Sequence, residues 1–326
     1  MARMLVTGAA GFIGSQLSER LIEIGHSVIG VDCFSDHYAR ELKEMNLSEL
    51  EGASAFDFVS SDIARGSLCE MLDGIDVVFH LAARPGVRDS WVDFDDYVEA
   101  NIIGSRSVFD AAVATGTRVV YASSSSVYGD AASLPVSEAH PLRAISPYGA
   151  SKVMTEVLAG AYAASYGLNA VGLRYFTVYG PRQRPDMGLA RFIEALIGGR
   201  PISLYGDGMQ KRDMTYVGDV VEATIAAAEK GASRRVYNVA SGSPRALLDI
   251  LSELGDSLAL PLRLAHEAPK AGDVRDTWGD IALATADLGW TPRVPLAEGL
   301  ARQVEEAERR RPTLVAQSRR AGVASV

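Results

Sequence analysis

The chain has 326 residues, of which 48% are hydrophobic and 22% charged, with a formal net charge of −9 at pH 7. This length and apolar content suit one large domain or two joined ones, and the acidic balance argues against broad binding to nucleic acid or to anionic membranes. The only two cysteines, Cys33 and Cys69, have no His or Cys neighbours. We therefore expect no disulfide framework, no metal site and a cytoplasmic location. No segment approaches the ~18 apolar residues of a membrane span.

The first half of the chain alternates short β-branched runs with amphipathic stretches. We expect strands at residues 4–6, 27–31, 56–59, 77–81 and 118–122, and helices at residues 14–23 and 98–115. Apolar strands that alternate with helices predict a parallel sheet covered on both faces. The expected fold is therefore α/β, a doubly wound parallel (Rossmann) sheet with a smaller C-terminal substrate-binding domain.

The pattern becomes irregular near Gly180-Pro181-Arg182. Beyond it we expect helices at residues 189–198 and 215–229 and a strand at residues 236–239. The expected Rossmann domain comprises residues 1–180, with 213–240 returning to it, and the expected substrate domain comprises residues 181–212 and 241–312. From residue 309 the sequence is basic and without periodicity, so a flexible tail is expected over 313–326.

A glycine motif, Gly8-Ala9-Ala10-Gly11-Phe12-Ile13-Gly14, follows the first strand and opens the first helix. Glycines there permit a tight turn and close approach to a diphosphate, and the helix N-terminus favours negative charge. Asp32 ends the next strand, where a carboxylate binds ribose hydroxyls and repels the phosphate of NADP. A glycine turn can join any strand to a helix, but the βαβ context and Asp32 favour NAD. Residues 62–63 and 81–83 also follow strands, at the edge where a dinucleotide binds.

Tyr148 and Lys152 stand four residues apart, which places them on one face of a helix. A nearby ammonium favours the phenolate, so we expect Lys152 to lower the pKa of Tyr148 from about 10 and make it a base near neutral pH. The spacing alone also fits an unrelated surface helix. The serine run 123–126, at the end of a predicted strand, and Asn101, on a helix within reach, favour an active site.

These features resemble the extended short-chain dehydrogenase/reductase family of nucleotide-sugar enzymes. The resemblance spans Gly8 to about Arg275, with the further motifs Val127-Tyr128-Gly129, Arg174-Tyr175-Phe176, Gly180-Pro181-Arg182 and Arg212-Asp213. It implies that Ser124 hydrogen-bonds the reacting sugar oxygen, that Tyr148 moves the proton and that Lys152 holds the ribose and the phenolate. The residues it implies for NAD are Gly8, Gly11, Phe12, Ile13, Gly14, Asp32, Lys43, Asp62, Ile63, Leu81, Ala82, Ala83, Asn101, Ser123, Tyr148, Lys152, Tyr175 and Val178.

The residues beside the catalytic serine indicate the reaction. Dehydratases of this family carry Asp and Glu where this chain has Ser125 and Ser126, and a hydroxyl cannot replace a carboxylate as the acid or base that expels water. Decarboxylases usually keep a Glu at the position of Ser126. With dehydration and decarboxylation disfavoured, the expected reaction is epimerisation. The sugar is transiently oxidised at C4, and the same hydrogen then returns to the other face.

Thr177 indicates the sugar. Residues 174–180 and 184–187 resemble UDP-glucuronate 4-epimerases, whereas many relatives have Asn in place of Thr177. Ser125, Ser126 and Thr177 then offer neutral donors to the C6 carboxylate, and Arg184 gates or positions the acid. The alternative is that these hydroxyls only cap loops.

The remaining candidates concern the rest of the substrate and the assembly. The resemblance implies Arg212 and Arg275 as ligands of the UDP diphosphate, although surface ion pairs with Asp213 and Asp276 explain them as well. Tyr205 is a candidate for the uracil and Arg88 for the sugar or phosphate. Helices 98–115 and 148–166 resemble those that pair in a homodimer.

Several other functions fit the same scaffold. They are a UDP-glucose or UDP-N-acetylglucosamine 4-epimerase, a UDP-glucuronate decarboxylase, a net NAD-dependent dehydrogenase and a non-catalytic NAD sensor. Intact Tyr148 and Lys152 argue against the sensor, which has no use for an activated phenol.

Overall fold

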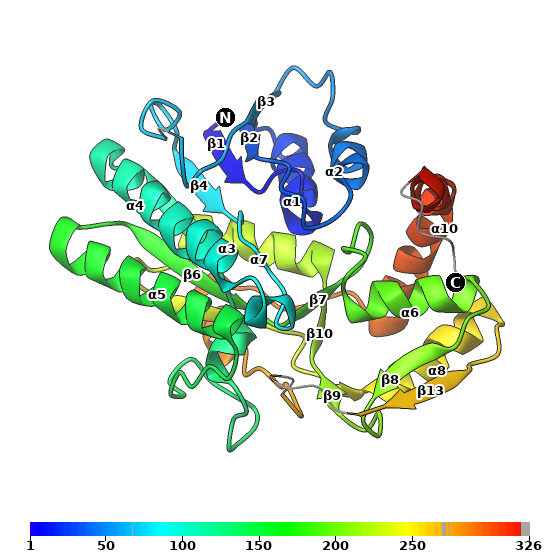
Figure 1. The fold of residues 1–326 in the computed structure, drawn as a ribbon. Coiled ribbons are helices and arrows are strands. Elements are labelled where there is room, and N and C mark those ends of the chain that lie inside the picture. Colours follow the sequence, from blue (N-terminus) through cyan, green and yellow to red (C-terminus); the bar gives the residue numbers. More distant parts are fainter. Residues whose placement is uncertain (67, 269–271, 273, 321–326) are drawn as a thin grey trace.

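A seven-stranded parallel sheet forms the centre of the computed structural model, which describes residues 1–66, 68–268, 272 and 274–320, with side chains through residue 311 (Figure 1). The strand order is β11-β6-β5-β4-β1-β2-β3. These strands are β1 (Arg3–Thr7), β2 (Ser27–Asp32), β3 (Phe56–Ser60), β4 (Val77–His80), β5 (Arg118–Ser124), β6 (Ala170–Tyr175) and β11 (Val236–Val239). The order reverses between β1 and β4, and ligands of such sheets bind at that point, outside the carboxyl ends of the strands. The expected doubly wound sheet is confirmed, with β6 as an additional strand.

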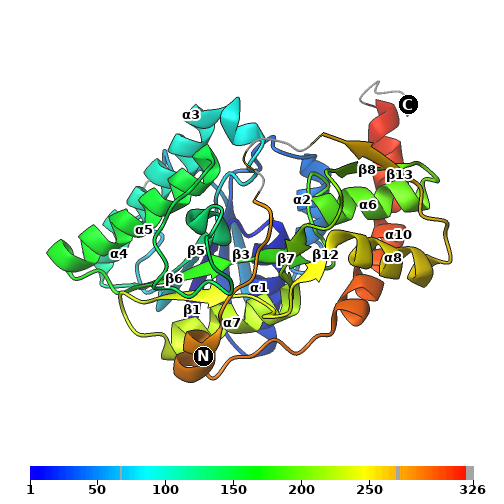
Figure 2. The same ribbon diagram turned by 90° about the horizontal axis from the view of Figure 1, so that it is seen from below.

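Helices cover both faces of the sheet (Figures 1 and 2). On one face lie α1 (Phe12–Glu23) and α7 (Val217–Lys230), whose buried side chains share a hydrophobic core with Val6 and Val120. On the other face lie α4 (Gly104–Thr115) and α5 (Pro147–Tyr166), which form a second core with Leu5 and Val78. Successive residues of each strand therefore face opposite cores, which is why these strands read as continuous apolar runs.

Shorter elements complete the sheet side. They are α2 (Arg40–Leu47), α3 (Phe94–Tyr97), a π-helical turn at Val98–Ile103 and α9 (Ala282–Leu288). Helix α9 packs against α7 and β11, and the Trp290 indole donates a hydrogen bond to the Asp219 carbonyl. This part of residues 241–312 therefore lies beside the sheet, which differs from its assignment to the substrate domain.

A smaller group of elements lies at one end of the molecule (Figure 1). It contains α6 (Gly188–Ile197), α8 (Leu247–Leu258) and the parallel pair β8 (Ile202–Tyr205) and β13 (Leu264–Glu267). Two further strand pairs connect it to the sheet. They are β7 (Thr177–Tyr179) with β10 (Met214–Tyr216), and β9 (Lys211–Arg212) with β12 (Arg245–Ala246).

The last helix, α10 (Leu296–Arg320), corrects the expectation of a flexible tail over residues 313–326 as far as residue 320. The rest of that tail, residues 321–326, lies outside the described residues. Its buried face combines Leu300 and Val304 with two polar residues, Gln303 and Arg310. A search for apolar periodicity overlooks a face that continues in buried polar side chains. Within the described chain, no helix is both long enough and apolar enough to cross a membrane.

Candidate active site

A cavity of about 1930 Å³ opens between the sheet and the smaller group of elements. Pockets for one small ligand measure roughly 300–1,000 Å³, so this cavity has room for two nucleotide-sized molecules. The predicted residues that line it are Gly8, Gly11, Phe12, Ile13, Gly14, Asp32, Lys43, Asp62, Ile63, Leu81, Ala82, Ala83, Arg88, Ser123, Ser124, Ser125, Ser126, Tyr148, Lys152, Tyr175, Thr177, Val178, Arg184 and Tyr205.

The glycine motif forms a cradle in which backbone packs on backbone too closely for side chains. Gly8 has a φ of +73°, and a Cβ on it would lie 2.8 Å from the Ala82 nitrogen. A Cβ on Gly14 would lie 2.1 Å from the Gly8 carbonyl oxygen. Helix α1 starts directly after Gly11. This open backbone at a helix N-terminus fits the diphosphate of a dinucleotide.

Asp32 lies at the end of β2, beside the cradle. Its carboxylate accepts hydrogen bonds from the backbone nitrogens of Phe34 (2.8 Å) and Ala10 (3.2 Å). Burial raises the pKa of Asp32, and the positive charge of Lys43 opposes that shift. Lys43 Nζ donates to the Ser35 carbonyl at 2.7 Å, so Lys43 shapes the loop after β2. A carboxylate fixed in this way suits the ribose hydroxyls of NAD.

Tyr148, Lys152 and Ser124 converge in the middle of the cavity. Helix α5 begins after Ser146, whose hydroxyl caps Gly149 N, so Tyr148 lies in the first turn and Lys152 one turn later. Lys152 Nζ is buried and donates to the Ala122 carbonyl of β5 at 2.9 Å. The ring of Tyr97 contacts Tyr148 edge-on, with centroids 6.2 Å apart. Lys152 therefore ties α5 to β5, and the Tyr148 ring packs against α3.

The pKa of Tyr148 differs from the expectation. Burial raises it above its usual value, while a hydrogen bond with Ser124 and the positive charge of Arg184 act to lower it. Burial also lowers the pKa of Lys152 to about 8. Desolvation therefore outweighs the expected effect of Lys152 in the protein alone.

The serine run spans the end of β5, at Ser123 and Ser124, and the start of the turn that follows it, at Ser125 and Ser126. Ser124 Oγ accepts from Ser126 N at 3.1 Å, which starts the short 3₁₀ turn Ser125–Tyr128. Ser123 donates to Glu156 of α5, which also binds Arg174 of β6 through a buried ion pair of 2.7 Å. Strands β5 and β6 and helix α5 are thus joined through Glu156.

Tyr175 and Val178 line the cavity from the opposite side, with Thr177 between them. The hydroxyl of Tyr175 is hydrogen-bonded to Thr224 Oγ1 of α7 at 2.8 Å, so its ring rather than its hydroxyl is offered to the cavity.

Three predicted ligands do not line the cavity in the described part of the chain. Asn101 is buried and holds the backbone of Arg84 and the hydroxyl of Ser151, so it positions the loop after β4. Arg212 donates to the carbonyls of Val274 and Arg275. The side chain of Arg275 is 71% exposed and lies 4.0 Å from Asp207. Arginine is a frequent partner of carbonyls and surface carboxylates, which sequence alone does not distinguish from phosphate binding.

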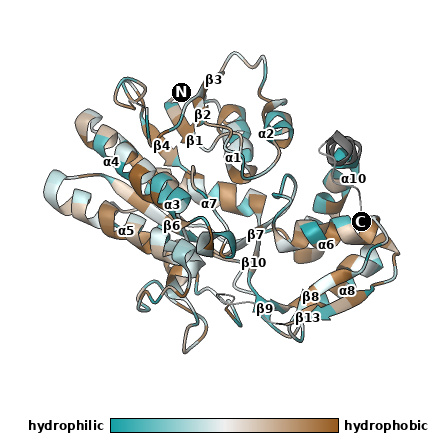
Figure 3. Cartoon of the chain, in the orientation of Figure 1, coloured by the Kyte–Doolittle hydropathy of each residue, from teal (hydrophilic) through white to brown (hydrophobic). Residues whose placement is uncertain are grey.

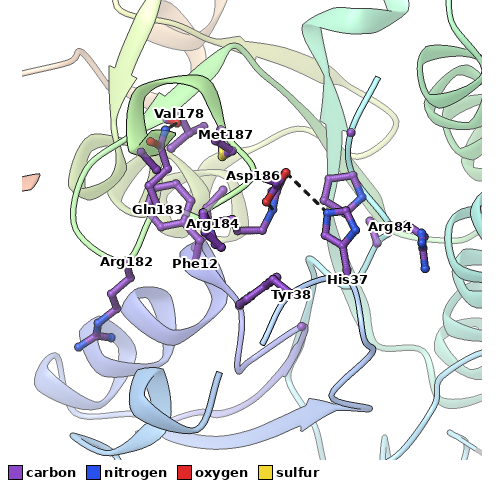
Figure 4. A pocket seen from close by; sticks show the side chains of 18 of the residues that line it. Phe12, His37, Tyr38, Arg84, Val178, Arg182, Gln183, Arg184, Asp186 and Met187 are labelled. Atoms are coloured by element: carbon purple, nitrogen blue, oxygen red, sulfur yellow. Dashed lines mark hydrogen bonds and ion pairs between the residues drawn. The ribbon is translucent and has the colours of Figure 1, made fainter. Parts of the chain in front are cut away.

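Sequence reasoning missed several residues of the cavity wall. They are His37 and Tyr38 from the loop after β2, Arg84, Gln183 and Asp186, and Gln303, Glu306 and Arg310 from α10. Figure 4 shows His37 and Asp186 pointing toward each other across the cavity. These residues belong to no sequence motif, because only the folded chain brings them together.

Helix α10 reaches the glycine cradle through a chain of hydrogen bonds. Arg310 donates to Asn46 Oδ1 at 2.8 Å, and Asn46 Nδ2 donates to the Ala10 carbonyl at 2.9 Å. Gln303 accepts from Gly180 N at 2.9 Å and donates to Gln183. The C-terminal helix therefore supports both the cofactor cradle and the loop that carries Arg184.

Two further contacts lie in the cavity wall. Arg184 binds Asp186 through Nε at 3.0 Å and Nη2 at 2.9 Å. The guanidinium of Arg88 lies over the ring of Tyr205, 4.3 Å from its centroid. Among the described residues, no group of three or more His, Cys, Asp and Glu side chains could hold a metal ion.

Comparisons with known proteins agree with this geometry. Residues 4–240 match the model of the NAD dependent epimerase/dehydratase family. A UDP-glucose 4-epimerase of Mycolicibacterium smegmatis is 38% identical, over 93% of this chain and 97% of its own length. A UDP-glucuronate 4-epimerase of Thermodesulfobacterium geofontis is 36% identical, over 93% and 95%.

The fold is also similar to a crystal structure of a 4-epimerase. The UDP-glucuronic acid 4-epimerase of Bacillus cereus, in complex with UDP-glucuronic acid and NAD, superposes with a TM-score of 0.92 at 38% identity. The similarity covers 94% of this chain and 99% of that one. The chain therefore belongs to the NAD dependent epimerase/dehydratase family.

Proposed function

We propose that this chain is an NAD-dependent 4-epimerase that interconverts UDP-glucuronate and UDP-galacturonate. The observation that carries the proposal is the meeting of Ser124, Tyr148 and Lys152 beside the glycine cradle, with Ser125 and Ser126 where a dehydratase would carry carboxylates. The family match and the similarity to 4-epimerases support the same reaction class.

The residues of the cavity account for how NAD would be held. The cradle at Gly8, Gly11 and Gly14 would hold its diphosphate, Asp32 its adenosine ribose, and Lys152 its nicotinamide ribose; all five residues line the cavity. When bound, NAD supplies a reversible two-electron oxidation at the sugar. Since no electrons are lost overall, the cofactor has no need to leave between turnovers.

The protein's own part is proton transfer and positioning. Tyr148 takes the proton of the sugar 4-hydroxyl and returns it to the same oxygen after the ring has presented its other face. Ser124 holds that oxygen through a hydrogen bond. The ammonium of Lys152 lies one helical turn from the phenol and stabilises its charged form once the substrate and cofactor exclude water.

The choice of a uronate rests on the hydroxyls around the sugar end. Ser125, Ser126 and Thr177 line the cavity, and Arg184 lies on the facing loop. Neutral donors can fix a C6 carboxylate in the ring plane, which opposes the alignment needed for loss of carbon dioxide. The similarity to a UDP-glucose 4-epimerase makes UDP-glucose the second candidate substrate.

NMR of UDP-glucuronate incubated with the enzyme tests the proposal. The expected result is the growth of UDP-galacturonate signals without added NAD beyond a catalytic amount. Accumulation of NADH would instead indicate a net dehydrogenase, and a pentose nucleotide with carbon dioxide would indicate a decarboxylase. Conversion of UDP-glucose or UDP-N-acetylglucosamine but not UDP-glucuronate would overturn the uronate assignment.

The substitution Thr177→Asn tests the hydroxyl cluster by itself. We expect it to lower kcat/KM for UDP-glucuronate about ten-fold relative to UDP-glucose, since one charge-assisted hydrogen bond contributes roughly 1.5–3 kcal/mol. Unchanged selectivity would contradict the role given to Thr177.

We also propose that the protein is a cytoplasmic homodimer. Helix α5 exposes an apolar stripe at Ala150, Met154, Val157, Ala161 and Ala164, and its ribbon is brown and white along much of its length in Figure 3. This 4-3-4-3 spacing is typical of a face that packs against another helix. Both cysteines carry free thiols, which suits a reducing compartment.

A further inference from the structure

Two neighbouring side chains in the loop after β2 reach the cavity with unpaired polar atoms. His37 Nε2 and the Tyr38 hydroxyl are buried and have no hydrogen-bond partner among the described residues. The His37 side chain is only 7% exposed. Buried polar atoms are nearly always hydrogen-bonded, so two neighbouring atoms without a hydrogen bond in a cavity wall point to a function.

The loop that carries His37 is held in place by its own contacts. Asp32 accepts from Phe34 N, and Lys43 donates to both the carbonyl and the hydroxyl of Ser35. The Lys43 ammonium also lies 5.0 Å from the centroid of the Tyr38 ring. His37 is therefore presented from a fixed loop immediately beside Asp32, at the adenosine end of the cavity.

The facing loop presents a carboxylate. Asp186 Oδ2 lies 3.6 Å from His37 Nε2, too far for a hydrogen bond but within the range of an ion pair. Burial acts to raise the pKa of Asp186, but His37 and Arg184 outweigh it and hold that pKa well below its usual range. Asp186 is therefore ionised, and its charge faces the His37 imidazole.

The facing loop is fixed as well. Arg182 binds Glu19 of α1 at 2.7 Å, and Gln183 donates to the Val178 carbonyl at 2.9 Å. The contact between His37 and Asp186 thus joins two anchored loops from opposite walls of the cavity (Figure 4). A ligand lying between Asp32 and the glycine cradle would be enclosed beneath it.

We propose that His37 and Asp186 form a clasp that retains the cofactor by slowing its passage in both directions. This inference rests on NAD as the cofactor of the proposed function. The contact between His37 and Asp186 is already formed without NAD, so it adds little to the affinity for NAD. It instead slows both the association and the dissociation of NAD. The sugar end is bridged differently, by the stack of Arg88 on Tyr205, so substrate exchange does not require the clasp to open.

Exchange of NAD measures the clasp directly. The variants are His37→Ala, which removes the clasp, and His37→Lys, which places an ammonium opposite Asp186. The association and dissociation rates of NAD are followed by stopped-flow binding and by chase with a fluorescent NAD analogue. We expect both rates to rise about ten-fold in His37→Ala, with Kd changed by less than three-fold, and His37→Lys to stay within three-fold of the wild type.

Two control variants define the alternatives. Arg88→Ala removes a cation from the other end of the same cavity, and Glu44→Gln removes an exposed ion pair on α2. Neither should change NAD exchange. The clasp is overturned if His37→Ala leaves both rates unchanged, if only dissociation rises, if His37→Lys exchanges as fast as His37→Ala, or if Arg88→Ala has the same effect.

The outcomes separate this inference from the proposed function. A wild type that binds NAD and shows the expected rates but epimerises no UDP-sugar would overturn the proposed reaction and leave the clasp in place. A wild type that binds no NAD would overturn both.

Discussion

At the scale of single residues, the chemistry depends on two buried groups with opposite needs. Tyr148 must lose a proton, and burial raises its pKa; Lys152 must stay charged, and burial lowers its pKa to about 8. Lys152 donates to the Ala122 carbonyl, and Tyr148 is hydrogen-bonded to Ser124. Such perturbed pairs are typical of active sites, where stability is given up for reactivity.

Replacing Tyr148 with Phe tests the proton transfer. Because general acid–base catalysis contributes roughly 10²–10⁴-fold, we expect kcat to fall about a thousand-fold while bound NAD is retained. Turnover by NMR and NAD content by absorbance provide the two readouts. Tyr166→Phe, on the exposed end of the same helix, serves as the control and should turn over normally. Full activity in Tyr148→Phe would remove the central element of the mechanism.

Replacing Lys152 with Met should abolish activity and stabilise the fold. The pKa of Lys152 is lowered from 10.5 to about 8, which means that the folded state disfavours its charged form by about 3 kcal/mol. The Met variant avoids this cost but loses the hydrogen bond to Ala122, worth about 1 kcal/mol, so its net gain in stability is smaller by that amount. This cost is present below pH 8 and disappears as the pH rises to 10.5, since only the unfolded state then keeps the proton. The free energy of unfolding of the variant minus that of the wild type, compared by urea titration, should therefore fall by about 3 kcal/mol over that interval. A constant difference would contradict the assigned pKa.

At the scale of elements, sequence predicts whatever is carried by local pattern. The glycine motif, the apolar strands and the spacing of Tyr148 and Lys152 are visible because each repeats a physical requirement along the chain. The sequence does not reveal the end of helix α10, since its buried face uses the polar residues Gln303 and Arg310. It also does not reveal the contact between His37 and Asp186, which meet only across the cavity. Arg212 shows the reverse, a motif residue whose guanidinium binds backbone carbonyls.

Helix α10 should influence the cofactor through Arg310. Substituting Arg310 with Met removes its hydrogen bond to Asn46, which holds the Ala10 carbonyl of the cradle. One such bond contributes roughly 1 kcal/mol, so we expect the Kd for NAD to rise about five-fold in calorimetric titration. The neighbouring Arg309, which is 59% exposed, offers the matched control Arg309→Met with unchanged affinity. Equal effects of both variants would rule out the path through Asn46.

At the scale of the whole molecule, the exposed stripe on α5 predicts the assembly. The substitution Val157→Glu would place two like charges, one from each subunit, in the proposed twofold interface. We expect sedimentation at micromolar concentration to change from dimer to monomer. Met209→Glu alters an equally exposed apolar residue outside the stripe and should sediment like the wild type. A wild-type monomer, or a variant that remains dimeric, would exclude this interface.

The path of the chain around the cavity has a consequence for biosynthesis. The cradle begins at Gly8, yet its wall is completed by Arg310, so residues about three hundred positions apart must meet before the cofactor is enclosed. During translation the N-terminal part leaves the ribosome first and can fold first. The nascent sheet then waits with its nucleotide face open until α10 has emerged, which makes capture of the dinucleotide one of the final events in maturation.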